Sequence, residues 1–155
     1  MKNIILLLFI LLIFISCEKK QTSYTAQEIE RTILSLEQKA LDLFSSGDPN
    51  GYIINFSNDA TYFDDIEAFT RLDSLSEIKK YFTSLNGKVT PHSYKIIDSK
   101  VQIYGEIAIL TLSYNAKTND GNEQPQWKAT SVYRLIKGDW KVVHAHWSLI
   151  KDDNS

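Results

Sequence analysis

Apolar residues recur at intervals of three and four along the segment that begins near residue 25, and this spacing predicts an amphipathic helix. Thr25 and Glu28 have the spacing of a capping box at its beginning, and Gly47 is typical of a C-terminal stop. The apolar stripe of this helix consists of Ile29, Ile33, Leu36, Ala40, Leu43 and Phe44.

Two further helices are predicted before the strands. The pair Asp48-Pro49 has the residue types that cap and begin a short helix. Ser74 and Glu77 form a second capping-box sequence, which opens a third helix. The apolar residues of the short helix are Tyr52, Ile53 and Phe56. Those of the third helix are Ile78, Tyr81, Phe82 and Leu85.

Alternating apolar and polar residues predict strands throughout the second half of the chain. Short turns that contain glycine separate them, and such turns join antiparallel neighbours into a meander. Helices followed by an antiparallel sheet indicate an α+β fold. The predicted strands are 60–64, 94–104, 106–117, 126–137 and 139–150.

The alternation also assigns the strand residues to two faces of the sheet. On the last strand it places Val143, Ala145 and Trp147 on the apolar face that meets the helices. The opposite face is mixed in polarity, which is typical of a protein–protein interface. We therefore expect a homodimer through this face, with its apolar part formed by Ile107, Ile109, Trp140 and Val142.

Composition and charge narrow the possible functions. The chain has 155 residues, and residues 1–16 contain one charged side chain, Lys2, so the remainder carries a net charge of about −3. This balance gives no electrostatic basis for binding nucleic acid. The single cysteine excludes an internal disulfide, and no Cys/His cluster with zinc spacing occurs. We expect no cofactor and no metal.

The N-terminus has the pattern of a secretory signal peptide, residues 1–16. Lys2 is followed by an apolar stretch of twelve residues, which is too short for a stable membrane span. The stretch ends at Ser16-Cys17, which resembles the lipobox of bacterial lipoproteins, where the cysteine is lipidated and becomes the new N-terminus. Residues 17–24 then form the lipidated cysteine and a polar tether. An uncleaved anchor with an incidental Cys17 is the alternative.

Three parts of the chain resemble the SnoaL-like members of the nuclear transport factor 2-like superfamily. They are Ser46 to Pro49, Asn58 to Asp64 and the closing hairpin from Val132 to Ser148. The hairpin is also similar to the association domain of calcium/calmodulin-dependent protein kinase II. The resemblance covers residues 25–151. It implies a cone-shaped barrel with helices on the concave face of the sheet, a pocket between them, and dimers formed through the sheet.

Asp64 is the candidate catalytic residue. It stands where the resemblance to ketosteroid isomerases implies a catalytic base. The positions that carry the oxyanion donors in those enzymes fall near Ala40 and Ser131, which cannot replace them. Steroid-type isomerisation is therefore not expected. A solvated turn carboxylate beside Asp65 is the alternative to a functional Asp64.

An aromatic pocket is the other candidate site. Ser131 and Trp147 occupy positions where the kinase association domain has arginines, so an anion pocket is not expected. We expect instead a pocket for a small, largely apolar ligand. The alternative is that its aromatic residues simply fill the core. The predicted lining is Tyr62, Asp64, Tyr114, Trp127, Ser131, Tyr133 and Trp147.

His144 and His146 share one face of the last predicted strand, a spacing that could bind a metal. No third ligand stands at a suitable spacing, so a hydrogen-bonded pair in the interface is the better interpretation. The sequence as a whole indicates a lipid-anchored, extracytoplasmic domain of a bacterial cell envelope. We expect this domain to bind a small, largely apolar ligand in its cone or to act as an accessory assembly domain. The alternative is a small lyase, isomerase or cyclase that uses Asp64 as general base.

The lipoprotein interpretation makes a direct prediction for Cys17. Replacing it, as Cys17→Ala, should abolish both lipidation and signal cleavage, because no other residue of the chain can form the thioether. Fractionation and mass spectrometry of the processed N-terminus would measure this. Recovery of a cleaved, lipid-free wild-type protein from the membrane-free fraction would contradict the anchor.

Overall fold

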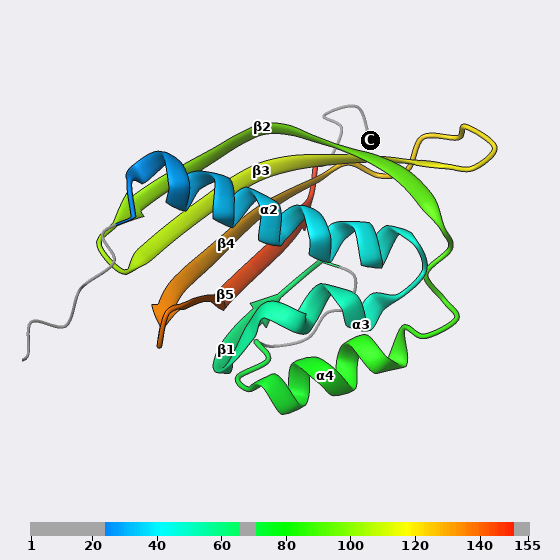
Figure 1. Cartoon of the computed structure of the whole chain (residues 1–155). Coiled ribbons are helices and arrows are strands. Elements are labelled where there is room, and N and C mark those ends of the chain that lie inside the picture. Colours follow the sequence, from blue (N-terminus) through cyan, green and yellow to red (C-terminus); the bar gives the residue numbers. More distant parts are fainter. Residues whose placement is uncertain (1–23, 66–70, 151–155) are drawn as a thin grey trace, which may run out of the picture.

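The computed structural model describes residues 24–65 and 71–150, and in this part of the chain three α-helices lie on one side of a five-stranded sheet (Figure 1). The signal peptide, Cys17 and most of the tether lie outside the described residues. The helices are α2 (Ala26–Ser45), α3 (Pro49–Tyr52) and α4 (Leu75–Ser84), with a 3-10 turn at Ile53–Asn55. The strands are β1 (Phe56–Phe63), β2 (His92–Tyr104), β3 (Ile107–Thr118), β4 (Trp127–Ile136) and β5 (Asp139–Leu149).

Both longer helices begin at the caps that the sequence predicts. Thr25 and Glu28 form the full capping box, in which each side chain bonds to the other residue's backbone N–H. Ser74 caps α4 by accepting a hydrogen bond from the Glu77 N–H, while the Glu77 carboxylate reaches the N–H of Asp73 instead of that of Ser74. These side chains satisfy N–H groups that the first helical turn leaves without a partner.

The predicted short helix is only partly correct, because Phe56 begins β1 rather than continuing the helix. The apolar stripe of α2 is also rotated. Leu43 is 38% exposed, whereas Glu37 and Leu41 are buried. Leu43 packs closely on Gly51, where an added Cβ would lie 2.2 Å from the Leu43 Cβ. Only glycine allows α2 and α3 to approach this closely.

The sheet has the strand order β1-β5-β4-β3-β2. Strands β2 to β5 form the antiparallel meander that the glycine turns predict. Strand β1 pairs in parallel with β5, so the sheet is mixed and not purely antiparallel. This pairing brings residues far apart in sequence together, and the alternation pattern of a single short strand contains no information about its partner.

A β-bulge in β5 changes which of its residues face the core. Val132 of β4 pairs with His144, but the next residue pairs with Val142, so Val143 is the extra residue. The expectation that Val143 faces inward and that Trp140 and Val142 face outward is wrong. Trp140 and Val142 are 7% and 3% exposed and belong to the core, because a bulge reverses the alternation on one side of it.

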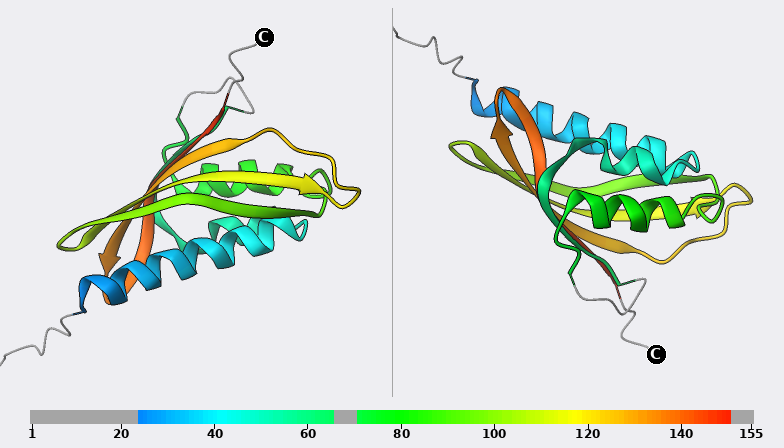
Figure 2. Two further views of the ribbon diagram at one scale, coloured as in Figure 1. Left: turned by 90° about the horizontal axis from the view of Figure 1, so that it is seen from above. Right: turned by 90° about the horizontal axis from the view of Figure 1, so that it is seen from below.

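A second irregularity bends β2. The pairing with β3 shifts between Ile97 and Lys100, and Asp98 lies in the left-handed region with φ of 52°. Bulges of this kind bend a strand and increase its twist. Figure 2 shows how strongly the sheet twists from β2 to β1. The curved sheet, with the helices on its concave face, thus has the expected cone shape.

Within residues 24–65 and 71–150, none of the helices combines the length and the apolar character needed to cross a membrane. The outer face of the sheet, away from the helices, keeps half-buried residues such as Ile107, Ile109 and Thr111. Without Trp140 and Val142, this face is less apolar than the sequence pattern indicates.

The bulge in β5 can be tested by truncating residues on either side of the register change. Trp140→Ala should lower the free energy of unfolding by about 3–5 kcal/mol, because it empties a buried site. Val143→Ala should cost about 1 kcal/mol or less, because this residue is half-buried. Urea denaturation measures both. The reverse order would mean that β5 follows the uninterrupted alternation.

Candidate functional site

A cavity of about 430 Å³ lies between the helices and the concave face of the sheet. It opens at one end, between the segment that leads into β2 and the β3–β4 connection, where Lys88, Thr90 and Gln124 are exposed. We call it the cone cavity. Aromatic side chains dominate its wall: Phe44, Tyr52, Tyr62, Phe82, Tyr114, Trp127 and Trp147.

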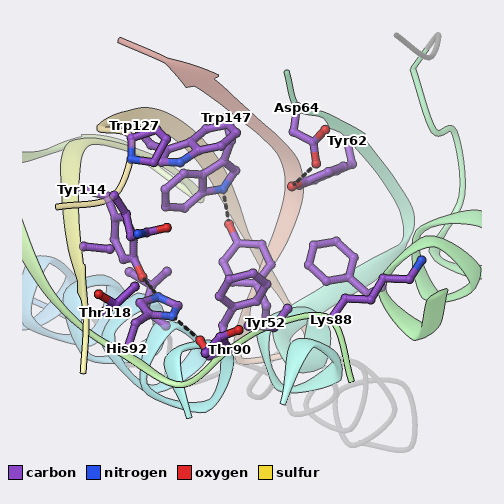
Figure 3. Close-up of a pocket in the computed structure, with 17 residues that line it drawn as sticks. Tyr52, Tyr62, Asp64, Lys88, Thr90, His92, Tyr114, Thr118, Trp127 and Trp147 are labelled. Carbon is purple, nitrogen blue, oxygen red and sulfur yellow. Dashed lines mark hydrogen bonds between the residues drawn. The ribbon is translucent and has the colours of Figure 1, made fainter. Parts of the chain in front are cut away.

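Asp64 marks one side of the cone cavity. It directly follows β1 and is 9% exposed. The hydroxyls of Tyr62 and Tyr81 both donate to its Oδ2, at 3.1 and 2.6 Å. Burial, with the nearby Asp64 charge, raises the pKa of Tyr62 well above its usual value, so this hydroxyl stays protonated and remains a donor. Figure 3 shows Asp64 and Tyr62 on one side of the cavity and Trp127 on the other.

The centre of the wall is a chain of hydrogen bonds that leads into the core. The Trp147 Nε1–H donates to the Tyr52 hydroxyl at 2.6 Å (Figure 3). Tyr52 in turn donates to Glu37 Oε1 at 3.5 Å, and Tyr133 donates to Glu37 Oε2. Glu37 lies on α2 and is 2% exposed. This chain connects α2, α3, β4 and β5 through one buried carboxyl group.

Burial has the largest effect on the Glu37 carboxyl group and raises its pKa. Hydrogen bonds from the hydroxyls of Tyr133, Tyr52 and Ser131 lower this pKa, but by less than burial raises it. A buried carboxyl without hydrogen-bond partners would be far more costly. Burial also raises the pKa values of Tyr52 and Tyr133 well above the usual value. Both tyrosine hydroxyls therefore stay protonated and remain hydrogen-bond donors at neutral pH.

His92 and Tyr114 form a hydrogen-bonded pair near the opening. His92 Nδ1 lies 2.8 Å from the Thr90 carbonyl oxygen, which can only accept, so Nδ1 carries a hydrogen. A neutral imidazole then accepts the Tyr114 hydroxyl hydrogen at Nε2, 2.6 Å away. The Tyr114 ring also packs edge-on against Trp147, with centroids 5.7 Å apart.

The family assignment follows from comparison with known proteins. A family model described as a SnoaL-like domain matches residues 33–152. The chain belongs to the SnoaL-like family. No curated protein matches it in sequence. The resemblance stated for the sequence is therefore confirmed, including the α+β cone fold.

Solved structures place this SnoaL-like domain among nuclear transport factor 2-like folds. A Parabacteroides distasonis protein named putative ketosteroid isomerase is 27% identical, with a TM-score of 0.69 over 86% of this chain and 95% of that one. An NTF2-like protein of unknown function from Pseudomonas putida is 22% identical, with a TM-score of 0.73 over 84% and 93%. The CaMKII hub of S. rosetta is 24% identical, with a TM-score of 0.63 over 77% and 95%.

The SnoaL-like domain brings most of the sequence-predicted site residues to one cavity. Tyr62, Asp64, Tyr114, Trp127 and Trp147 all line it. The two other predicted residues, Ser131 and Tyr133, lie behind the wall beside Glu37. The predicted site residues therefore form two groups: those that line the cavity, and a supporting group around Glu37 that includes Ser131 and Tyr133.

Sequence reasoning missed Glu37, Tyr52, Phe82 and His92 as parts of the site. A signal existed for Glu37, because it follows Ile33 by four residues and precedes Leu41 by four, on the buried face of α2. Tyr52 and Phe82 were assigned only to apolar helix stripes. Their rings stack with centroids 5.4 Å apart, a contact between α3 and α4 that neither helix pattern predicts.

The aromatic rings act both as core and as lining. Tyr62, Tyr114 and Trp147 are only 4%, 6% and 8% exposed, and they pack on neighbouring rings. They nevertheless leave an open volume between them. The two alternatives considered for these residues, core filler and pocket wall, are thus not exclusive.

The histidine pair of β5 lies away from the cone cavity. His144 Nδ1 is 2.8 Å from the Thr61 hydroxyl, and the Phe63 ring packs near both imidazoles. Burial, followed by the neighbouring His146, lowers the pKa of His144. In the described part of the chain, no three His, Cys, Asp or Glu side chains gather as metal ligands would.

The buried carboxyl gives a prediction about pH. Because the folded-state pKa of Glu37 is raised, its contribution to stability is full below the ordinary value of 4.5 and is lost as pH rises through the folded-state pKa. Glu37→Gln imitates the protonated form at every pH. The variant should therefore gain stability relative to the wild type as pH rises above about 4.5, as followed by thermal denaturation. A constant difference across this range would contradict the raised pKa.

Proposed function

We propose that this SnoaL-like domain binds a small, largely apolar molecule in the cone cavity. The main support for this proposal is the volume of the cavity, about 430 Å³. It lies within the range of about 300–1,000 Å³ that is typical of sites for small organic molecules. The wall combines aromatic rings with a few fixed polar groups, which is also typical of such sites.

The hydrogen-bond network supports a preformed site. The Trp147 indole is held by Tyr52, and Tyr52 by Glu37, so these rings have fixed orientations before any ligand enters. A wall that needs no rearrangement loses little conformational entropy on binding. The proposed role of the network is therefore to keep the cavity open and its aromatic walls in place.

An enzymatic role for Asp64 is the second candidate. It is supported by the placement of a buried carboxylate on the cavity wall and by the name of the Parabacteroides distasonis protein. A general base must come within hydrogen-bond reach of a substrate proton. In this domain Asp64 already accepts two tyrosine hydroxyls, so catalysis would require a substrate to compete with them. We therefore favour binding as the function.

Naphthalene is a suitable probe for the proposed function, because it is apolar and has no hydrogen-bonding groups. The wild-type domain should bind it with a measurable dissociation constant in calorimetric titration. Ala116 lines the cavity and is 4% exposed, so Ala116→Phe should fill part of the space and weaken binding at least about tenfold. Ala116→Ser preserves the size and is the matched control. A wild-type domain that binds no naphthalene would contradict an open cavity.

We further propose that Cys17 anchors the domain through lipid at the outer side of a bacterial membrane, with residues 18–24 as tether. The described domain begins at Tyr24, which is 48% exposed, next to the first turn of α2. The opening of the cone cavity lies toward the C-terminal end of this helix of 20 residues. An anchor at the opposite end would leave the opening accessible from the aqueous side.

The proposed homodimer uses the outer face of the sheet, with Ile107 and Ile109 at its centre. Light scattering of residues 24–155 at tens of micromolar should give the mass of a dimer. Thr111→Arg should weaken the dimer, because it buries an unpaired charge. Ser84→Arg introduces the same charge at an exposed position of α4 and should not. A monomer mass for the wild-type domain would contradict the proposal.

A further inference from the structure

The buried polar side chains that line the cone cavity use their hydrogens within the protein. We call this set the inner wall; its members are Tyr52, Tyr62, Asp64, Tyr114 and Trp147, and the half-buried Trp127 is not part of it. Trp147 donates to Tyr52, and Tyr52 donates to Glu37. Tyr62 donates to Asp64 on the other side. With His92 neutral, the Tyr114 hydroxyl donates to its ring as well. None of these hydrogens is available to a ligand, whereas the hydroxyl oxygens of Tyr62 and Tyr114 still have lone pairs that can accept one.

The raised pKa values of the tyrosines keep their hydroxyl hydrogens in place throughout the ordinary pH range. Burial raises the pKa of Tyr52, Tyr62 and Tyr114, so none of these hydroxyls becomes a phenolate. Each hydroxyl has one hydrogen and can accept in addition; Tyr52 already accepts from Trp147, whereas Tyr62 and Tyr114 can accept from a ligand. The inner wall is therefore a hydrogen-bond acceptor surface.

The charge of the inner wall is negative, so it favours the same ligands as the acceptor oxygens do. Asp64 is the charged side chain among the buried residues that line the cavity in the described part of the chain. Lys88, the other charged lining residue, is exposed at the opening, and in Figure 3 its amine end points away from Trp147 and Tyr114. A cation in the cavity would meet a buried carboxylate, whereas an anion would be repelled by it.

The aromatic faces favour cations too. The rings of Tyr52, Phe82, Tyr114 and Trp147 surround the inner volume. Aromatic faces carry partial negative charge, and they attract ammonium groups within about 6 Å, most strongly where water is excluded. Three separate features therefore favour a ligand that carries a hydrogen-bond donor with a positive charge: the acceptor oxygens, the buried carboxylate and the aromatic faces.

Resting on the proposed function, we propose that the ligand of the cone cavity carries a hydrogen-bond donor, above all a protonated amine, on an apolar or aromatic body. The amine would lie on the inner wall near Asp64 and the tyrosine oxygens. The apolar body would lie between the rings. Carboxylates and other anions of the same size would be excluded.

Four naphthalene derivatives of nearly equal size test this inference by calorimetry with the purified full chain at pH 7. They carry at the same position an aminomethyl group, a hydroxymethyl group, its methyl ether, or a carboxylate. We expect the ammonium to bind at least about tenfold more tightly than the ether, and the alcohol about threefold more tightly than the ether. The carboxylate should bind more weakly than unsubstituted naphthalene.

Two variants then separate the buried charge from general electrostatics. Asp64→Asn should reduce the preference for the ammonium over the alcohol about tenfold. Asp98→Asn changes the net charge equally on an exposed part of β2, where asparagine suits the left-handed backbone, and should leave this ratio unchanged. Circular dichroism confirms that each variant is folded.

The outcomes distinguish this inference from the proposed function. If the carboxylate binds best, or if all four derivatives bind equally, the donor preference is wrong although the cavity still binds small molecules. If an Asp98→Asn change alters the ratio as much as Asp64→Asn, the selection does not come from the inner wall and the inference is overturned. If neither naphthalene nor any derivative binds, the proposed function itself fails.

Discussion

The burial of Glu37 is the constraint on which the site depends. A carboxyl group on the buried face of a helix must find hydrogen-bond partners, or its burial would cost more than the neighbouring apolar contacts contribute. Its partners are Tyr52 of α3 and Tyr133 of β4, and Tyr52 in turn accepts a hydrogen bond from Trp147 of β5. The position of α2 over the sheet is thereby tied to the orientation of the cavity wall.

Hydrogen bonds that lead from the aromatic side chains to buried carboxyl groups explain why these side chains leave space between them. Rings that were free to turn could pack toward the centre of the cone and fill it. Trp147 is held at its indole nitrogen and Tyr62 at its hydroxyl, so both rings stay on the wall. The same bonds use the hydrogens of Trp147 and Tyr62, so neither group can donate to a ligand, and the carboxylate that holds Tyr62 adds a negative charge to the wall. Stability and selectivity thus have a common origin in these bonds.

The sequence predicts the elements well because their signals are local. Caps at Thr25 and Ser74 and the glycine turns of the meander depend on neighbouring residues, and the structure has helices and strands at these places. The parallel pairing of β1 and the bulge at Val143 depend on contacts between distant segments. The bulge turns Trp140 and Val142 from the outer face of the sheet to the core face, and an alternation pattern does not show where a bulge occurs.

The candidate site was predictable to a similar extent. Aromatic residues on the inner strand positions, together with Asp64, identify much of the lining, because strand alternation determines their side of the sheet. The supporting group around Glu37 depends on how α2 meets α3 and β4 in space, and periodicity alone treats a glutamate as a surface residue. The distinction between a wall and a filled core is a property of the packing, so it required the structure.

The cone of this SnoaL-like domain contains an open, largely apolar cavity. A crystal structure determined under xenon pressure tests this most directly, because xenon binds in apolar cavities and scatters strongly. We expect a xenon site enclosed by Phe82, Tyr114 and Trp147, with Trp147 still bonded to Tyr52. A cone without xenon, in which these rings have moved together and fill the space, would contradict it.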